Sequence, residues 1–426
     1  MKKEYRKMAR KANGKIREIK EGRVTIEVAL PIAEVLMGTT EVVENIGREI
    51  GLMVLSAVIE SEAEQKAGKK NEKNPQRSAN WWGSQIGPIY YDGQKVLIDR
   101  PRIRSKENKE LALETYIALQ NPRKMRKTVL KDMVLGISSR NYEETVEKLL
   151  RGYGIKKSSI SRHFVQATAA QMREFLERSL SGFNLCAIFI DGIEFKGEHL
   201  IVALGIDITG HKQILGLWQG ATENAAICGN LLEDLQRRGL DTGKDYLFVL
   251  DGSKALRSAV TRMFGKDVEV QRCQQHKRRN VKAHLSPEHQ TTIDARIRAA
   301  YNMVNYEDAK KSLELTVRYL ERLNPSAARS LAEGLEETLT VHRLRVNGLL
   351  RKTLASTNPI ESCFSITRTI TGRVKRWRKG DMVQRWAVTA LLRAESKFRR
   401  VKGYKEIPQL LAVLHNKSID RKEVAA

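Results

Sequence analysis

Five short apolar segments between Leu185 and Asn280 constrain the fold of this chain more than any other feature. Short runs rich in Ile, Val, Leu and Phe predict buried strands. Helical patterns at 222–238 and 253–264 separate the last three segments. The order strand-strand-strand-helix-strand-helix-strand predicts an α/β fold with a mostly buried mixed sheet and helices on its faces. The five predicted strands are 186–190, 200–206, 213–217, 246–250 and 268–271.

After the last of these strands the apolar spacing changes to steps of three and four residues, which indicates helices. The order of strands resembles that of a ribonuclease H-like domain, but the last helix of such a domain begins only after residue 357. We therefore predict a ribonuclease H-like domain at 181–284 and 356–400, interrupted by an all-helical insertion domain at 285–355. Residues 401–426 form a C-terminal tail.

The first 120 residues are predicted as a basic N-terminal region with one long helix and a small hairpin. Apolar residues recur at helical spacing from about Thr40 to Gln65. Residues 66–80 are polar and lysine-rich, which favours a linker or an exposed loop. A hairpin is expected to turn at Asp92-Gly93.

Residues 121–180 contain a helix-turn-helix candidate. Asn141 followed by Glu144 is a capping-box pattern for a helix at 142–150. Gly152-Tyr-Gly154 suits a turn, and Ser158 is a candidate cap for a second helix. Short polar side chains and an arginine at a helix start suit contact with the major groove, although many helical pairs with a glycine turn bind nothing. The candidate DNA contacts are Ser159, Ser161, Arg162 and His163.

The positive charge of the chain is large and uneven. The formal net charge is +26, and residues 364–405 alone carry thirteen basic and two acidic residues. Clustering of one sign favours a phosphate backbone as the partner over simple solubility. Aromatic residues among arginines suit stacking on bases; Trp386 is expected in the core and Trp377 at the DNA. The candidate DNA contacts here are Arg373, Lys375, Arg376, Trp377 and Arg378.

No apolar run approaches the length of a membrane span, so we expect no membrane partner. The basic first residues are not followed by an apolar segment, so they do not resemble a secretion signal. The four scattered cysteines suit a reducing compartment, which predicts a cytoplasmic protein.

Two of the predicted strands end in the same dipeptide, Asp191-Gly192 and Asp251-Gly252. An aspartate just beyond a buried strand is held at the sheet edge. Two such carboxylates on neighbouring strands repel each other unless a divalent cation lies between them. The pattern therefore indicates a metal site, although Asp-Gly is also a common turn dipeptide.

Glu361 is the third acidic candidate, and it has an alternative structural explanation. In Thr357-Asn-Pro-Ile-Glu361, Asn358 suits an N-cap, Pro359 suits the first helical position, and Glu361 falls where a capping-box glutamate lies. Spacing alone favours the cap.

Cys273 and His276 form half of a zinc-site pattern, but no second pair with suitable spacing is present. The alternative that we favour places them beside an active site, with His276 bonded to an acidic residue or a phosphate. Three basic residues follow directly, and we expect them to contact the DNA backbone or else to form a solvated basic face: Lys277, Arg278 and Arg279.

Taken together, these segments resemble the Mutator-like transposases of bacterial insertion sequences, a branch of the Asp-Asp-Glu transposases. The resemblance runs in order from about residue 125 to 390, and its Cys-x-x-His-Lys-x-x-Asn block is highly specific. The first 120 residues resemble the family only loosely. The matching segments are Asp191-Gly192, Gly220-Ala-Thr-Glu-Asn224, Asp234-Leu-Gln-Arg-Arg-Gly-Leu240, Asp251-Gly252, Gln271-Arg-Cys-Gln-Gln-His-Lys-Arg-Arg-Asn280, Thr357-Asn-Pro-Ile-Glu361 and Arg368.

The resemblance implies that Asp191, Asp251 and Glu361 are the catalytic residues and hold Mg²⁺ or Mn²⁺, with two ions expected. The supporting residues would be Cys273, His276, Asn280 and Arg368. The implied function is metal-dependent cleavage and strand transfer at the terminal inverted repeats of a mobile element, by a homodimer or higher oligomer on double-stranded DNA in the bacterial nucleoid.

Two rival functions remain open at this point. One is a domesticated transposase that acts only as a DNA-binding regulator, but all three acidic positions are filled, which argues against decay. The other is an RNA-binding structural protein, which would explain the charge but not the ordered acidic motifs.

Overall fold

The computed structural model divides the chain into two compact units, residues 1–167 and 168–426, and each unit is described by itself. The residues that the structure describes are 14–20, 23–28, 40–72, 77–92, 94–121, 130–131, 133–134, 157–195, 197–220, 225–346, 348–374, 376–377 and 380–424.

The N-terminal unit contains a long helix and a hairpin that packs on it. Helix α3 (Thr40–Ala67) confirms the predicted helix. Strands β3 (Ala79–Tyr91) and β4 (Gln94–Ser105) pair antiparallel, with Tyr91 opposite Gln94, so the hairpin turns where we predicted. The hairpin is longer than expected, because β3 begins at Ala79, inside the segment predicted as a linker. The other elements are β1 (Gly14–Lys20), β2 (Arg23–Val28), β5 (Glu110–Leu111) and α4 (Glu114–Leu119).

Of the predicted helix-turn-helix, only the second helix lies within the described residues. Helix α7 (Lys157–Glu177) begins one residue before Ser158, so Ser158 is inside the helix and is not its cap. The predicted first helix at 142–150 and the turn at 152–154 lie outside the described residues.

The C-terminal unit is built on a five-stranded mixed sheet in the order β10-β9-β6-β7-β8. Strand β9 runs parallel to both β6 and β10, whereas β6–β7 and β7–β8 are antiparallel. The predicted α/β pattern and mixed sheet are confirmed. The strands are β6 (Leu185–Phe195), β7 (Glu198–Asp207), β8 (Lys212–Gly220), β9 (Leu247–Leu250) and β10 (Glu269–Arg272).

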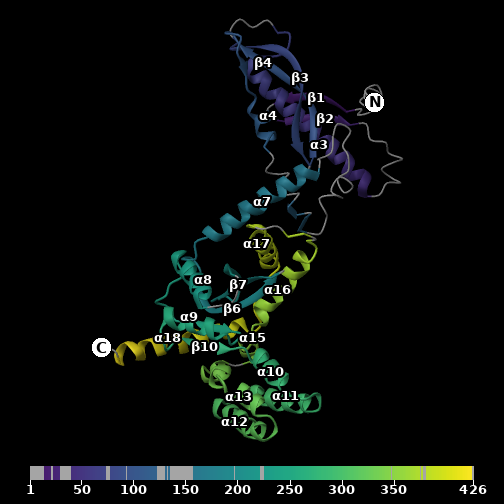
Figure 1. Ribbon diagram of the computed structural model, residues 1–426. Coiled ribbons are helices and arrows are strands. Elements are labelled where there is room, and N and C mark those ends of the chain that lie inside the picture. The colour runs from purple at the N-terminus through teal and green to yellow at the C-terminus, as the bar shows by residue number, and fades with distance from the viewer. Residues whose placement is uncertain are drawn as a thin grey trace. The chain divides into compact units, whose positions relative to one another are not determined.

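Helices cover both faces of this sheet, as Figure 1 shows. Alternate residues of a strand point to opposite faces. Ile188 and Ile190 of β6 join the core beneath α8 (Ala225–Arg237) and α9 (Lys254–Phe264). Ala187 and Phe189 join the core that includes side chains of α16 (Asn358–Thr371) and α17 (Met382–Glu395). Asp191 is two residues after Phe189 on the same strand, so its side chain points to the same face of the sheet, toward α16.

Between β10 and α16, the elements in the described part of the chain are all helices. Side chains of α10 to α13 form a hydrophobic core of their own, which includes Ile297, Leu313 and Leu331. The helices between β10 and α16 are α10 (Gln274–Ala283), α11 (Pro287–Asn302), α12 (Tyr306–Leu323), α13 (Pro325–Ala332), η1 (Glu336–Leu339), α14 (Thr340–Arg343) and α15 (Gly348–Leu354). A short η2 (Tyr404–Glu406) and α18 (Ile407–Val424) follow α17. In the described part of the chain, no helix combines the length and the apolar character that crossing a membrane requires.

Candidate active site

Asp191 and Asp251 lie side by side, Asp191 on β6 and Asp251 directly after the adjacent parallel strand β9. Ile190 is the register partner of Leu250, so the next residue of each strand is an aspartate. Neighbouring strands are about 4.8 Å apart. Asp251 follows the end of β9 as predicted, but Asp191 is not at a strand end, because β6 continues to Phe195 and Asp191 pairs with Val202 of β7. Pairing with β7 extends β6 beyond its parallel neighbour.

Both aspartates accept hydrogen bonds from nearby backbone. Gly192 N–H donates to Asp191 Oδ1 at 2.8 Å, and Ser253 N–H donates to Asp251 Oδ1 at 2.8 Å. Within the described residues, neither carboxylate forms an ion pair with a lysine or arginine. Asp191 is buried, with 5% of its surface exposed. Burial, followed by the negative charge of Asp251, raises the pKa of Asp191 to about 7, although His276 opposes the rise.

Glu361 projects from the first turn of α16 toward the same region. His276 Nε2 lies 3.4 Å from Glu361 Oε1, and the Thr357 hydroxyl donates to that oxygen at 2.9 Å. The charge of Glu361 also acts on the pKa of Asp191. The predicted alternative of a capping box at Asn358 is wrong, because the N-cap residue is Thr357 and Asn358 is already helical.

A capping-box glutamate would bond the backbone N–H of the N-cap residue. That N–H group of Thr357 instead donates to the sulfur of Cys273 at 3.3 Å. Counted from Thr357, Glu361 is the fourth helical position, and its carboxylate contacts the side chains of Thr357 and His276 instead of a backbone N–H.

Cys273, His276 and Thr357 form a network between the first turns of α10 and α16. Cys273 is the N-cap of α10, and its sulfur accepts from the His276 N–H. The Thr357 hydroxyl oxygen, whose proton is donated to Glu361, lies 3.4 Å from the same sulfur. A hydrogen bond with Cys273 and the charges of Cys273, Asp191 and Glu361 raise the pKa of His276 to about 9, against the effect of burial. The imidazole is therefore positively charged near neutral pH and offsets part of the carboxylate charge. The predicted proximity of His276 to an acidic residue is confirmed.

The three carboxylates supply oxygen ligands, which Mg²⁺ prefers. The structure brings Asp191 and Asp251 together and places Glu361 within electrostatic reach of them. However, no group of three or more His, Cys, Asp or Glu side chains in the described residues is arranged to hold a metal ion. The two aspartates lie one residue beyond a registered pair of adjacent parallel strands, so carboxylate oxygens are available side by side. His276 and Thr357 contact the Glu361 carboxylate, which lies close enough to Asp191 to affect its pKa.

Of the three basic residues of α10 predicted to contact DNA, two instead bond other groups of the protein. Lys277 is 2% exposed, and its ammonium group donates to the carbonyl oxygens of Ser330 and Glu333 at 2.5 Å each, which corrects the prediction of a DNA contact. Arg278 is half-buried and forms a bidentate pair with Asp294 at 2.8 and 2.6 Å. Arg279 and Asn280 are exposed.

The other predicted contacts fall into three groups. Arg368 lies on α16 two turns after Glu361 and, like Arg373 and Arg376, is exposed. Trp377 is half-buried and packs against the hydrophobic core that includes Val383 and Ala387 of α17, so part of its ring is in contact with the protein interior. On α7, Ser161 and Arg162 are exposed and His163 is half-buried; the remaining candidates, whose side chains lie outside the described residues, are Ser159, Lys375 and Arg378.

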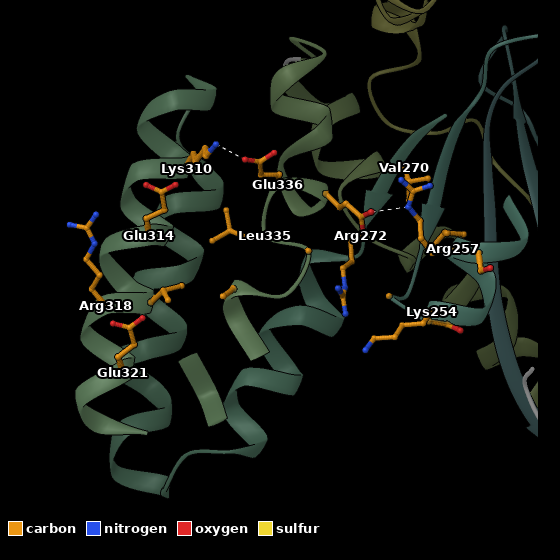
Figure 2. Close-up of a pocket in the computed structure, with 18 residues that line it drawn as sticks. Lys254, Arg257, Val270, Arg272, Lys310, Glu314, Arg318, Glu321, Leu335 and Glu336 are labelled. Atoms are coloured by element: carbon orange, nitrogen blue, oxygen red, sulfur yellow. Dashed lines mark hydrogen bonds and ion pairs between the residues drawn. The ribbon is translucent and has the colours of Figure 1, made fainter. Parts of the chain in front are cut away.

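A cavity of about 810 Å³ begins beside Asp251, at Gly252 and Ser253, and extends to α12. Figure 2 shows basic and acidic side chains from both walls of this cavity. Arg257 pairs with Glu337 at 2.8 Å, and Arg272 pairs with Glu333 at 3.3 Å. Its charges are thus largely paired, unlike those of the two aspartates next to it.

Sequence reasoning missed the role of Thr357. It is fully buried, and its hydroxyl and N–H connect Glu361 to Cys273. Its only signal in the sequence is its place directly before the Asn-Pro pair, which does not distinguish it from an ordinary helix start.

The fold and the site define a mixed α/β protein with two neighbouring aspartates, one within β6 and one directly after β9, and a third acidic residue on a later helix. The chain belongs to the Mutator family of transposases, whose family model matches residues 28–398.

Curated relatives agree with this assignment. The chain is 29% identical over 240 residues to the transposase for insertion sequence element IS6120 of Mycolicibacterium smegmatis, covering 55% of this chain and 72% of the relative. It is 26% identical to the transposase for IS905 of Lactococcus lactis, covering 62% and 67%. It is 27% identical to the transposase for ISRM5 of Rhizobium meliloti, covering 74% and 79%.

Proposed function

We propose that this protein is an Asp-Asp-Glu transposase that cleaves DNA at the terminal inverted repeats of an insertion sequence and joins the ends to target DNA. The observation that carries the proposal is the pair Asp191 and Asp251, which lie on adjacent strands with no lysine or arginine partner among the described residues. The family membership and the names of the relatives support DNA transposition as the process.

The fold supports the same proposal. We infer that the five-stranded sheet is a ribonuclease H-like core, because three antiparallel strands are followed by two parallel strands with intervening helices. We further infer that the helices from α11 to α15 are an insertion within this core. Gln274 N–H of α10 donates to the Ala355 carbonyl just before α16, so the chain leaves and returns at one place.

Asp191, Asp251 and Glu361 are the residues that would hold two Mg²⁺ or Mn²⁺ ions. When bound, such ions promote attack by a water or a DNA 3′-hydroxyl on phosphorus and stabilise the leaving oxygen. In the first step the water oxygen bonds to phosphorus and the bond to the 3′-oxygen breaks. The 3′-hydroxyl that remains then attacks a phosphate of the target DNA in the same manner.

The residues of the chain itself orient this site. The β6–β9 pairing fixes the two aspartates, and α16 brings Glu361 toward them. His276 and the Thr357 hydroxyl hold the Glu361 carboxylate in one orientation. The positive charge on His276 reduces the repulsion among three carboxylates before a metal binds.

The test is cleavage of a labelled duplex that carries one end of the element, with Mg²⁺ or with EDTA. We expect Mg²⁺-dependent nicking by the wild type and none by Asp251→Asn, while both proteins bind the duplex equally in a gel-shift assay. Asp241→Asn is the matched control, because this exposed aspartate lies outside the site, and it should cleave normally. Binding without cleavage by the wild type would instead identify a domesticated DNA-binding regulator. The same binding assay with size measurement would test the proposed homodimer or higher oligomer on DNA.

A further inference from the structure

The loop after α17 forms a fixed platform on the turn between β7 and β8. Val401 N–H donates to the Gly210 carbonyl at 2.9 Å, and Val401 itself is buried. Gly210 has φ of 84°, and a side chain there would collide with Tyr404. The Thr353 hydroxyl donates to the Lys402 carbonyl at 3.0 Å. These contacts hold the backbone of the loop in one position.

This loop carries a group of exposed cations, which we call the distal basic platform: Lys397, Arg399, Arg400, Lys402 and Lys405. In the part of the chain that the structure describes, none of the five forms an ion pair with a carboxylate. The platform is thus an excess of positive charge on a rigid surface.

The acidic residues close to the platform bond other groups. Glu406, which follows Lys405, accepts from Leu350 N–H at 3.2 Å. Asp207 accepts from the N–H groups of Thr209 and His211 at 2.9 Å each. Glu395 accepts from Ile214 N–H at 2.9 Å and pairs with Arg178 at 3.4 Å. Among the described residues, none of these carboxylates forms an ion pair with a platform cation.

The platform lies at the end of the sheet opposite the carboxylates. Leu185 is the register partner of Asp207, next to the platform, whereas Asp191 lies six residues further along β6. Six residues of strand span about 20 Å. These cations are therefore too far from the carboxylates to act on the reacting phosphate. Along one strand of duplex DNA, the same distance corresponds to about six nucleotides.

We propose that the distal basic platform binds the phosphate backbone of duplex DNA about six base pairs from the reacting phosphate, without reading its sequence. The ring of Tyr404 lies under Arg400 at 5.2 Å, and that of Phe398 lies under Lys212 at 4.7 Å. These aromatic rings face cations of the protein itself, which leaves charge as the means of contact. This inference rests on the proposed function, which makes DNA the partner.

The test replaces three platform cations together, Lys397→Gln, Arg399→Gln and Lys402→Gln, and leaves the anchoring residues unchanged. The matched control replaces three exposed cations of the helical segment with glutamine: Arg298, Lys311 and Arg322. Both triple variants remove the same charge. Affinity for a labelled 40-base-pair duplex of unrelated sequence is measured by fluorescence anisotropy in NaCl between about 50 and 200 mM.

The platform variant is expected to show a salt slope, log K against log [NaCl], that is smaller by about one for each phosphate that it no longer neutralises, about two to three in all. The control variant should keep the wild-type slope. An unchanged slope in the platform variant, or an equal change in both variants, would overturn the proposal. If the platform variant melts at a lower temperature than the control, the three single substitutions replace it, and each should reduce the slope by up to about one.

This result is independent of cleavage. If the platform variant shows the predicted smaller salt slope but the wild type never cleaves an element end, the proposed transposase activity alone is contradicted. If the wild type cleaves but the platform variant binds DNA with the wild-type salt slope, the DNA-binding role of the platform alone is contradicted.

Discussion

His276 Nε2 and Glu361 Oε1 lie 3.4 Å apart, although the whole run of helices from α11 to α15 separates them in the sequence. Two further bonds join the same helix starts, from Gln274 N–H to the Ala355 carbonyl at 2.9 Å and from Thr357 N–H to the Cys273 sulfur at 3.3 Å. The helical segment therefore begins and ends at the candidate active site. Its folding and the placement of Glu361 are coupled.

Replacing Glu361 with glutamine should abolish DNA cleavage and leave the fold intact. The amide keeps the size of the side chain and can still accept from the Thr357 hydroxyl, but it brings no charge to a metal. Cleavage of a labelled element end should fall by orders of magnitude in Mg²⁺, while DNA binding persists. The melting temperature should change little, because the loss of the ion pair with His276 and the loss of repulsion among the carboxylates oppose each other.

Glu288→Gln is the control for this substitution, since Glu288 also lies in the first turn of a helix after a proline but is exposed. Both variants are assayed from matched preparations. Near-normal cleavage by Glu361→Gln would show that this glutamate has no role at the metal.

Replacing Thr357 with valine should weaken cleavage without removing it. Valine preserves the shape of this fully buried side chain but lacks the hydroxyl that donates to Glu361. A hydrogen bond to a charged group contributes about 1.5–3 kcal/mol, and each 1.4 kcal/mol is a tenfold change in rate. We expect kcat to fall about tenfold or more and the Mg²⁺ concentration for half-maximal cleavage to rise.

Thr357→Ser restores the hydroxyl and should return both quantities toward the wild-type values. A purely structural role predicts the opposite pattern, in which the valine variant loses stability but keeps its Mg²⁺ requirement.

Replacing Gly252 with alanine should destabilise the C-terminal unit more than the same change at Gly197. Both glycines have positive φ, 105° and 85°, where a side chain costs about 1–2 kcal/mol. A Cβ at Gly252 would also collide with Arg272, whose side chain is held by Glu333, whereas nothing lies within 4 Å of a Cβ at Gly197. The extra cost should be about 1–3 kcal/mol, measured by urea unfolding. Equal losses at the two sites would show that Arg272 moves aside freely.

Because of Lys277, the free energy of unfolding should vary with pH in the alkaline range. Burial lowers the pKa of its ammonium group from the ordinary 10.5 to about 8. Between these two values the unfolded chain holds a proton that the folded chain has released, so the free energy of unfolding rises with pH. This contribution is complete above pH 10.5 and is lost as the pH falls through 8.

The measurement is urea unfolding of the wild type and of Lys277→Met across the pH range between these two pKa values. The wild type should gain on the variant by up to about 1.4 kcal/mol per pH unit within that window. Lys254→Met serves as the control, because Lys254 is exposed, and its difference from the wild type should stay constant. A constant difference for Lys277→Met as well would contradict the lowered pKa.

The sequence by itself determined the strands of the C-terminal unit and their mixed arrangement, and it identified Asp191 and Asp251 as residues that would meet if their strands were neighbours. Apolar runs and their lengths are local properties, and a parallel register between two strands that carry the same motif places its aspartates together. The sequence also determined that Trp386 belongs to the core, because the residue lies within a largely apolar helical segment.

Only the tertiary structure decided how the polar residues are used. Lys277 and Arg279 lie two positions apart on one basic helix, yet the first is buried against the carbonyl groups of Ser330 and Glu333 and the second is exposed. Likewise, Glu361 has the spacing of a cap counted from Asn358, but the N-cap is Thr357, so Glu361 lies one position beyond that of a capping-box glutamate. The partners of these groups come from distant segments, and local spacing carries no information about which of them packing will bring into contact.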